Sequence, residues 1–257
     1  MVELKNIYKY YNTGTVNETC LFNNFNLEVK KEQFISVVGS NGSGKTSMLN
    51  IICGSIPLEK GNIIMDGKDI TQEKEYKRLK NIGRVYQNPV FGTCPDMTIL
   101  ENMSLADNKG KPFNLSFGIN KKRIDYYRDC LRFLNLGLED KMDVKVGVLS
   151  GGQRQAMSLV MSTLTPIKFL ILDEHTAALD PKTAELIMEL TGKIVKEKKL
   201  TTIMVTHNLR YAVEYGNRLL MMHQGNIVMD KVGKEKEETQ IEHILNMFNE
   251  ISIECGN

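Results

Sequence analysis

The residues that point most directly to chemistry form a glycine-rich loop that ends in lysine and threonine. Gly39-Ser-Asn-Gly-Ser-Gly44-Lys45-Thr46 matches the pattern GxxxxGK[ST] and lies between a predicted strand and a predicted helix. Glycines let consecutive amide N–H groups point inward at phosphate oxygens, and a helix start adds a positive dipole end. Lys45 would reach the β and γ phosphates, and the Thr46 hydroxyl would bind magnesium. The loop therefore predicts nucleotide binding; the alternative is an ordinary glycine-rich turn.

A second candidate phosphate site is Leu149-Ser150-Gly151-Gly152-Gln153. Ser150 and Gln153 have the spacing of a capping box, so a simple helix start is the alternative interpretation. Two glycines in a first turn cost about 1 kcal/mol each relative to alanine. A sequence accepts that cost where a group must approach the backbone closely. Two copies that face each other antiparallel could therefore enclose two nucleotides, each between a loop and a helix start.

Acidic and basic side chains follow two predicted strands near the end of the chain. The apolar run 169–172 ends in Asp173 and Glu174, and His207 follows the strand-like run 201–205. Strands of an α/β fold deliver their terminal side chains to the carboxyl edge of the sheet, where ligands bind. Asp180 precedes Pro181 and is equally well explained as the N-cap of a long helix that starts there.

The elements that must position these residues fall into three regions. Residues 1–85 are predicted to be rich in strands, including 34–38, with a helix at 48–52 and a strand at 62–65 that ends in an Asp-Gly turn. Residues 88–165 are predicted to be helical, and strands then alternate with helices, which favours a parallel sheet covered by helices. Predicted helix signals are the capping boxes Thr98/Glu101 and Thr239/Glu242, and the apolar faces Ile124, Tyr127, Leu131, Leu134 and Ile241, Ile244, Leu245, Phe248.

Composition excludes several classes of protein. The formal net charge is only +2, from 33 basic and 31 acidic residues, so the chain has no basic excess for nucleic acid. Its five cysteines form no CxxC pair, which argues against zinc and against a disulfide framework and suits a reducing cytosol. We expect no signal peptide and no transmembrane helix, because no apolar run approaches the roughly 20 residues that a span needs.

Taken together, these motifs resemble those of ABC-family ATPase subunits over nearly the whole chain, to about residue 230. The residues that follow the order and spacing of that family are Gly39 to Thr46, Gln87, Leu149 to Gln153, Asp173, Glu174, Asp180 and His207. The resemblance implies an α/β fold of the P-loop NTPase type in one ABC ATPase domain. Its parts would be a RecA-like core with a mixed or parallel sheet and an antiparallel β subdomain (1–87 and 166–230), an inserted α-helical subdomain with the signature (88–165), and a short C-terminal helical tail (231–257).

The resemblance also implies roles for individual residues. Glu174 would be the general base for hydrolysis and Lys45 would act with it, while Gln87 and His207 would sense magnesium, the attacking water and the γ phosphate. Thr46, Gln87 and Asp173 would hold Mg²⁺. ATP would be bound by Tyr11, which is expected to stack on adenine, and by Gly39, Ser40, Asn41, Gly42, Ser43, Gly44, Lys45, Thr46, Ser47, Ser150, Gly151, Gly152 and Gln153.

One residue departs from the common family pattern. His175 follows Glu174, where many family members have proline, and the stretch DEHTAALDPKT resembles a bacterial subgroup associated with amino-acid import. His175 is interpreted as an interface substitution, with contact to the nucleotide or to a partner subunit as the alternative.

The resemblance implies the ATPase subunit of a bacterial solute importer, with amino acids among the candidate solutes. The expected partners are a second copy in an ATP-dependent head-to-tail dimer, membrane permease subunits and an extracellular solute-binding protein, with no nucleic acid. The chain would then lie on the cytoplasmic face of the membrane. The alternatives are the ATPase of a multi-subunit exporter and a soluble ABC mechanoenzyme, whereas the LSGGQ stretch argues against a metabolic P-loop kinase.

Overall fold

The structure, a computed structural model, describes residues 1–111 and 118–254, with side chains as far as residue 250 in the last helix. The chain forms two compact units: Met1–Glu73 with Thr201–Asn257, and Lys74–Leu200. The division into core, helical subdomain and tail that the resemblance implies follows other boundaries and stays a prediction.

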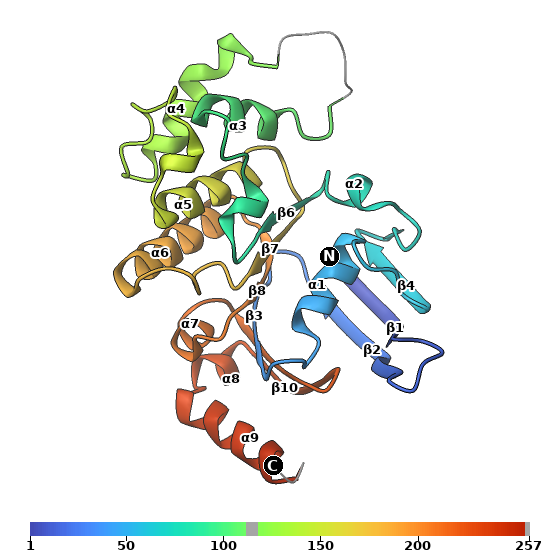
Figure 1. The fold of residues 1–257 in the computed structure, drawn as a ribbon. Helices are drawn as coiled ribbons and strands as arrows, with labels where there is room; N and C mark the ends of the chain where they lie inside the picture. Colours follow the sequence, from blue (N-terminus) through green and yellow to red (C-terminus); the bar gives the residue numbers. More distant parts are fainter. Residues whose placement is uncertain (112–117, 255–257) are drawn as a thin grey trace. The chain divides into compact units, whose positions relative to one another are not determined.

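An antiparallel sheet occupies the first part of the first unit (Figure 1). Its strands are β1 (Val2–Tyr11), β2 (Thr19–Val29), β4 (Lys60–Met65) and β5 (Lys68–Asp69), in the order β2-β1-β4-β5. β1 buries Val2, Leu4 and Ile7. Asp66 and Gly67 join β4 to β5 with positive φ angles of 49° and 77°, as a two-residue hairpin requires. The predicted Asp-Gly turn is therefore confirmed.

The same unit contains four strands of a mixed sheet, in the order β10-β9-β3-β8. These strands are β3 (Phe34–Gly39), β8 (Thr201–Val205), β9 (Arg218–His223) and β10 (Asn226–Val232). β3 is parallel to both β8 and β9, and β9 is antiparallel to β10. Every residue of β3 and β8 is buried, which explains why both read as continuous apolar runs.

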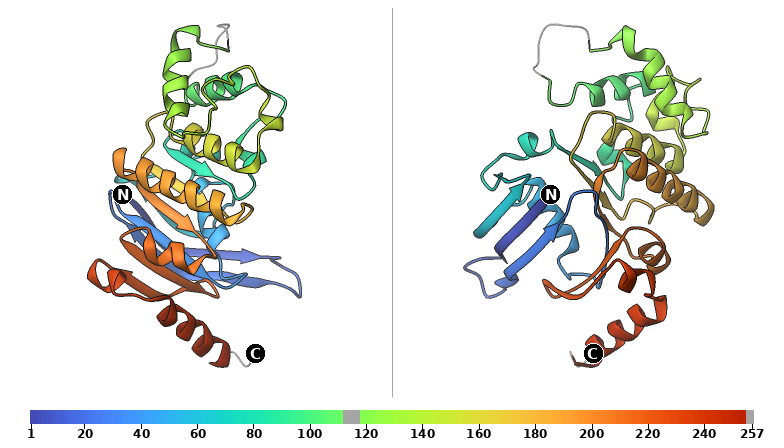
Figure 2. Two further views of the ribbon diagram at one scale, coloured as in Figure 1. Left: turned by 90° about the vertical axis from the view of Figure 1, so that its left-hand side faces the viewer. Right: turned by 180° about the vertical axis from the view of Figure 1, so that it is seen from behind.

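The described residues of this unit also form the helices α1 (Lys45–Cys53), α7 (Leu209–Glu214), α8 (Lys234–Glu237) and α9 (Ile241–Glu254). Figure 2 shows α9 in dark red towards the end of the chain. Ile244 is buried in a cluster with Val38 and Leu219, and Met247 and Phe248 pack against that cluster. Leu245 is 47% exposed. Its predicted place on the apolar face is therefore wrong, because that face follows the i, i+3, i+4 spacing from Ile244.

The predicted capping box at the start of this last helix is also wrong. Thr239 Oγ1 donates a hydrogen bond back to the Glu235 carbonyl at 2.6 Å, so its side chain closes α8. At the start of α9 the Gln240 N–H instead donates to Nδ1 of His243 at 3.3 Å. Thr239 and Glu242 have the spacing of a capping box. Helix α9, however, begins at Ile241, so Gln240 and not Thr239 directly precedes it.

The second unit combines two parallel strands with helices. Its elements are α2 (Glu75–Arg78), β6 (Ile82–Val85), α3 (Ile99–Asp107), α4 (Ile124–Arg132), α5 (Gly151–Ser162), β7 (Phe169–Asp173) and α6 (Pro181–Glu197), with single 3-10 turns at Pro89–Gly92, Lys121–Arg123 and Val146–Val148. Helices α3, α4 and α5 stay grouped in every view of Figures 1 and 2.

Two predictions for this helical part are confirmed. Thr98 Oγ1 accepts from the Glu101 N–H at 3.2 Å, and Glu101 accepts from the Thr98 N–H at 2.7 Å, which is the complete capping box of α3. These bonds to its ionised form hold the pKa of Glu101 below its ordinary value. Tyr127, Leu131 and Leu134 are all fully buried, so the 3.6-residue spacing identified the inner face of α4.

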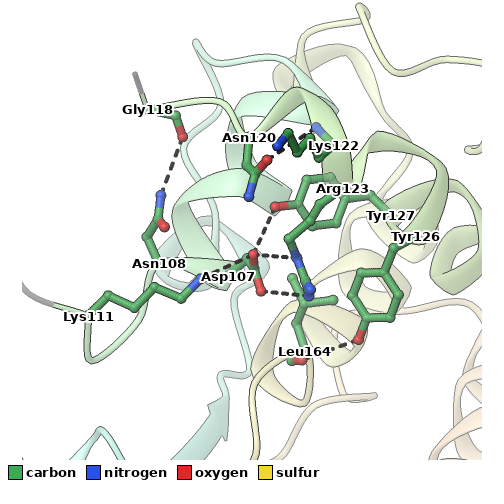
Figure 3. Close-up of polar contacts among 10 residues, drawn as sticks. All are labelled: Asp107, Asn108, Lys111, Gly118, Asn120, Lys122, Arg123, Tyr126, Tyr127 and Leu164. Atoms are coloured by element: carbon green, nitrogen blue, oxygen red, sulfur yellow. Dashed lines mark hydrogen bonds and ion pairs between the residues drawn. The ribbon is translucent and has the colours of Figure 1, made fainter. Parts of the chain in front are cut away.

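A buried carboxylate joins α3 to the start of α4 (Figure 3). Asp107 accepts hydrogen bonds from the Tyr127 hydroxyl at 3.0 Å and from an Arg123 NH2 group at 2.9 Å. Lys111 adds an ion pair at 3.3 Å. Burial and the bond to Asp107 raise the pKa of Tyr127, so its hydroxyl stays protonated and donates. Asp107 thus ties the two helices together through paired polar groups.

We expect Asp107→Ala to lower the free energy of unfolding by about 3 kcal/mol, because it leaves the Arg123 charge and the Tyr127 hydroxyl without their buried partner. Urea denaturation of the purified chain measures the change. The matched control is Asp129→Ala, whose side chain is 68% exposed in its ion pair with Arg132. Such a pair contributes less than about 1 kcal/mol. Equal effects of the two substitutions would contradict the assignment.

Candidate functional site

The glycine-rich loop joins β3 to α1, as the sequence predicts. The Lys45 side chain is buried and folds over the loop, and its Nζ donates to the carbonyl oxygens of Gly39 at 2.7 Å and Ser40 at 2.9 Å. Ser43 Oγ lies 3.5 Å from the same nitrogen. A full positive charge is therefore held inside the curl of the loop at the N-terminal end of a helix, where anions bind.

Gly39 is required by the close approach of a neighbouring strand. A Cβ atom added at Gly39 would lie 2.2 Å from the Met222 carbonyl oxygen and 2.8 Å from Ser43 Oγ. Gly39 pairs with Met222 of β9 in the parallel register. The backbone can therefore enter the loop only without a side chain at this position.

The parallel register of β3 and β8 brings His207 to the same sheet edge as the loop. Val37 pairs with Val205, and the Thr206 N–H donates to the Val37 carbonyl at 3.1 Å. Gly39 lies two residues after Val37, and His207 lies two residues after Val205. His207 is exposed, so its ring is accessible to a ligand at this edge.

Tyr11 and Ser47 are also neighbours in this unit. The Tyr11 hydroxyl and Ser47 Oγ share a hydrogen bond at 3.0 Å, which links the end of β1 to the first turn of α1. Lys9 Nζ lies 5.4 Å from the centroid of the Tyr11 ring. The ring is half-buried, and its hydroxyl end is fixed beside the phosphate loop.

A second group of predicted residues lies at the carboxyl edge of β6 and β7 in the other unit. These strands are parallel, and Val85 pairs with Leu172. Gln87 follows β6 by two residues, whereas Asp173 ends β7 and Glu174 follows it. The register therefore brings the amide and the two carboxylates to one edge, as expected for strand ends in an α/β fold.

The second unit also has a charged partner for Asp173 that sequence reasoning missed. An Arg84 NH2 group donates to Asp173 Oδ2 at 2.9 Å, with side-chain exposures of 7% and 12%. The Arg84 guanidinium also lies 4.6 Å from the centroid of the Tyr86 ring. Burying a carboxylate without a partner is costly, so Arg84 neutralises Asp173 on this sheet edge.

The donor set of the predicted metal residues fits Mg²⁺. A threonine hydroxyl, an amide and a carboxylate are hard oxygen donors, and Mg²⁺ is commonly held by one or two carboxylates with substrate phosphates and water. Among residues 1–111 and 118–254, no group of three or more His, Cys, Asp and Glu side chains could hold a metal by itself.

Glu174 and His175 form a strained turn directly after β7. Glu174 has φ 48°, a left-handed conformation that costs a non-glycine residue about 1–2 kcal/mol. His175 is 1% exposed, and its Nε2 lies 3.1 Å from Thr191 Oγ1 in α6. Burial lowers the pKa of His175 to about 4, so the ring is neutral at physiological pH. The interpretation of His175 as an interface residue is therefore wrong, because its ring is buried within its own chain.

Helix α5 begins within the stretch Leu149-Ser150-Gly151-Gly152-Gln153, which is called the signature below. Ser150 Oγ accepts from the Gln153 N–H at 3.2 Å, and Gln153 Oε1 accepts from the Ser150 N–H at 3.2 Å. The capping box is thus complete, and it leaves Ser150 exposed at the helix start. The interpretation of LSGGQ as a helix start with a capping box is therefore correct. It explains the serine and the glutamine, but not the two glycines.

The two glycines of the signature differ in whether packing within the chain requires them. A Cβ atom at Gly152 would lie 2.2 Å from Thr183 Cγ2, so internal packing against α6 excludes a side chain there. At Gly151 the nearest atom, Leu179 Cδ2, would lie at an ordinary 3.7 Å. Packing therefore does not require Gly151, and its exposed backbone leaves the start of α5 open to a ligand.

Helix α5 also holds the segment that leads to Gln87. Gln155 Nε2 donates to the Tyr86 carbonyl at 3.0 Å, and a Cβ atom at Gly92 would lie 2.5 Å from Ser158 Oγ. The signature helix and the residues around Gln87 are therefore packed as one body within the second unit. The predicted site residues thus form one group in each unit.

Sequence reasoning missed one more contact of the phosphate loop. His223 Nδ1 lies 3.4 Å from Ser40 Oγ, at the end of the strand that restricts Gly39. No local pattern marks His223 or Arg84, because each contacts a residue that is distant in the sequence: His223 contacts Ser40, and Arg84 contacts Asp173. Only the order of the strands could have revealed them.

Fold and site together define a P-loop nucleotide-binding protein of mixed α/β architecture. A family model described as ABC transporter matches residues 22–177. The chain is 47% identical over 248 residues to a tyrosine transport ATP-binding protein of Clostridioides difficile, covering 96% of this chain and 98% of that protein. It is 32% identical over 235 residues to a spermidine/putrescine import ATP-binding protein of Haemophilus influenzae, covering 91% of this chain and 59% of that protein.

Among solved structures, an ATP-binding cassette in a dimeric post-hydrolysis state with ADP and Pi is similar. It shares 30% identity and a TM-score of 0.77, with coverage of 90% of this chain and 98% of that chain. The chain belongs to the ABC transporter family. It is an ATP-binding subunit of that family and an ATPase.

One further observation concerns the membrane. Within the part of the chain that the structure describes, no helix combines the length and the apolar character needed to cross a bilayer.

Proposed function

We propose that this subunit powers a bacterial importer of amino acids, with tyrosine or a related aromatic amino acid as the solute. The observation that carries this proposal is the 47% identity to a tyrosine transport ATP-binding protein along 96% of the chain. The relative from Haemophilus influenzae is named for import, which supports that direction of transport. The stretch DEHTAALDPKT, which resembles a bacterial subgroup associated with amino-acid import, also supports this proposal.

ATP is bound first by the phosphate loop. Lys45 releases the Gly39 and Ser40 carbonyls and turns to the β and γ phosphates, while the loop amides hold the phosphate oxygens. Tyr11, fixed by Ser47, offers its ring to the adenine. When bound, Mg²⁺ supplies charge that stabilises the phosphates during hydrolysis. Thr46, Gln87 and Asp173 are the residues that would hold it.

Hydrolysis depends on the carboxylate that follows β7. Glu174 accepts a proton from the attacking water as the general base. Gln87 orients the same water from the neighbouring strand end, and His207 donates to the γ phosphate from the edge of β8. Arg84 keeps the Asp173 side chain in a fixed position through its buried ion pair.

The signature completes the site of a second copy. Ser150, Gly151, Gly152 and Gln153 present the N-terminal end of α5, whose partial positive charge favours a γ phosphate. The open backbone at Gly151 supports this role. A head-to-tail dimer places the signature of one chain over the phosphate loop of the other, and the related cassette with ADP and Pi is dimeric. ATP binds the closed dimer better than the open one, so each hydrolysis event moves an attached partner.

The membrane permease is proposed to dock on the segment after Gln87. Val90 and Phe91, in the 3-10 turn Pro89–Gly92, are 41% and 74% exposed. Two adjacent exposed apolar side chains support a protein partner at this turn. Because α5 holds Tyr86 and Gly92, movement of the signature would reach this surface directly.

Uptake of radiolabelled tyrosine by the source bacterium tests the substrate. Deleting the gene should remove the high-affinity uptake, and plasmid-borne wild-type chain should restore it, whereas Glu174→Gln should not. Uptake of lysine serves as the matched control. Normal tyrosine uptake in the deletion strain would contradict the proposed solute, and increased accumulation of tyrosine would indicate export.

A further inference from the structure

The direction of the Glu174 carboxylate depends on a strained backbone conformation. Glu174 adopts φ 48° directly after the buried strand β7. A non-glycine residue keeps such a conformation only where its surroundings enforce it. The contacts of the residues that follow contribute to this enforcement.

Local hydrogen bonds shape this turn. The Glu174 carbonyl accepts from the Ala177 N–H at 3.0 Å, and the Thr176 carbonyl accepts from the Leu179 N–H at 3.2 Å. Asp180 then accepts from the Thr183 N–H at 3.1 Å as the N-cap of α6. These bonds lie within the loop and at the start of α6, and a further contact attaches the start of the loop to the interior of the unit.

His175 makes that attachment. Its ring is 1% exposed and its Nε2 lies 3.1 Å from Oγ1 of Thr191, which is fully buried in the third turn of α6. Thr191 Oγ1 already donates its only proton to the Ile187 carbonyl at 2.7 Å. It can therefore only accept from the imidazole, so Nε2 carries the proton. The bond has one direction and both of its ends are buried in this unit.

We propose that His175 is a positioning residue for Glu174, anchoring the left-handed turn to α6 through Thr191. The inference rests on the proposed role of Glu174 as general base. Its physical basis is that the carboxylate must meet the attacking water within hydrogen-bond reach. An error of about 1 Å in the position of a reacting group can cost a factor of about 100 in rate. The bond from His175 to a long helix restricts that error.

The competing explanation is that a buried ring simply fills space. The two explanations make different demands on the side chains: anchoring needs a donor at His175 and an acceptor at Thr191, whereas filling needs only volume. Thr191→Val keeps the volume and removes the acceptor, and Thr191→Ser keeps the acceptor. His175→Phe keeps a ring without the donor.

The test uses the purified full-length chain and measures kcat and KM for ATP, the Kd for ATP, and the Tm. We expect Thr191→Val and His175→Phe to lower kcat between about 10-fold and 100-fold, with Kd and KM within about twofold because neither residue belongs to the phosphate loop. Thr191→Ser should stay within about threefold of the wild-type kcat, since one retained acceptor restores the bond. The double variant that combines His175→Phe with Thr191→Val should have a kcat no lower than that of His175→Phe alone, because the two residues act as one unit.

Three other results would overturn the inference. Wild-type kcat in Thr191→Val and His175→Phe, with Glu174→Gln inactive, would support Glu174 as the general base. It would also show that the bond between His175 and Thr191 does not position Glu174. A fall of kcat and of ATP-binding capacity in the same proportion would show that the ring only supports folding. Normal hydrolysis by Glu174→Gln would remove the proposed base and the anchor with it.

Discussion

Glu174→Gln will stop ATP hydrolysis while the protein continues to bind ATP. The substitution keeps the size of the side chain and removes the group that accepts a proton from water. Loss of a positioned general base typically costs about 100-fold to 10,000-fold in rate. Phosphate release by the purified chain measures the rate, and equilibrium titration with ATP should give a Kd close to the wild-type value.

The matched control for this prediction is Glu189→Gln, an exposed glutamate on α6 in the same unit. It removes the same negative charge away from the edge of β7. We expect wild-type hydrolysis from this variant. Hydrolysis by Glu174→Gln within threefold of the wild type would contradict the assignment of the base.

Lys45→Ala will weaken ATP binding by at least about 30-fold, because removing one partner of a desolvated, hydrogen-bonded charge pair costs 2 kcal/mol or more. Part of the lysine's binding energy is offset in the wild type, since Nζ must first leave the Gly39 and Ser40 carbonyls. Calorimetric titration with ATP in magnesium buffer measures the affinity. Hydrolysis should fall with it.

Lys234→Ala provides the control for the phosphate loop. Lys234 is exposed at the start of α8, in the same unit as Lys45, and its removal changes the net charge by the same amount. ATP affinity should therefore be unchanged in this variant. If Lys45→Ala bound ATP as tightly as Lys234→Ala, the loop could not hold the phosphates in the manner proposed.

Much of the fold could be predicted because its signals are local. Thr98 and Glu101 form the expected capping box, Asp180 caps α6 beside Pro181, and Asp66 and Gly67 form the expected hairpin turn. Each is decided within three or four neighbouring residues. The fully buried strands β3, β7 and β8 were visible as apolar runs for the same reason.

The remaining features depend on contacts between distant segments. Arg84 reaches Asp173 because β6 and β7 are neighbours, and Gly39 is required by the carbonyl of Met222 on β9. His175 looked like an interface residue because many family members have proline there, whereas its partner Thr191 lies three turns into α6. Before α9, Thr239 bonds back to Glu235 and the bond to His243 starts at Gln240. The spacing of residues alone does not decide at which of two neighbouring positions a helix begins.

We propose that two copies of the chain close head to tail around ATP. Light scattering of Glu174→Gln with and without ATP measures this closure, because the variant is expected to bind ATP without hydrolysing it. We predict the 29.2 kDa mass of one chain without nucleotide and twice that mass with ATP. Adding Ser150→Arg should abolish the dimer, since a cation at the start of α5 repels the helix dipole and fills the phosphate position. A single-chain mass at saturating ATP, or a dimer that survives Ser150→Arg, would contradict the claim.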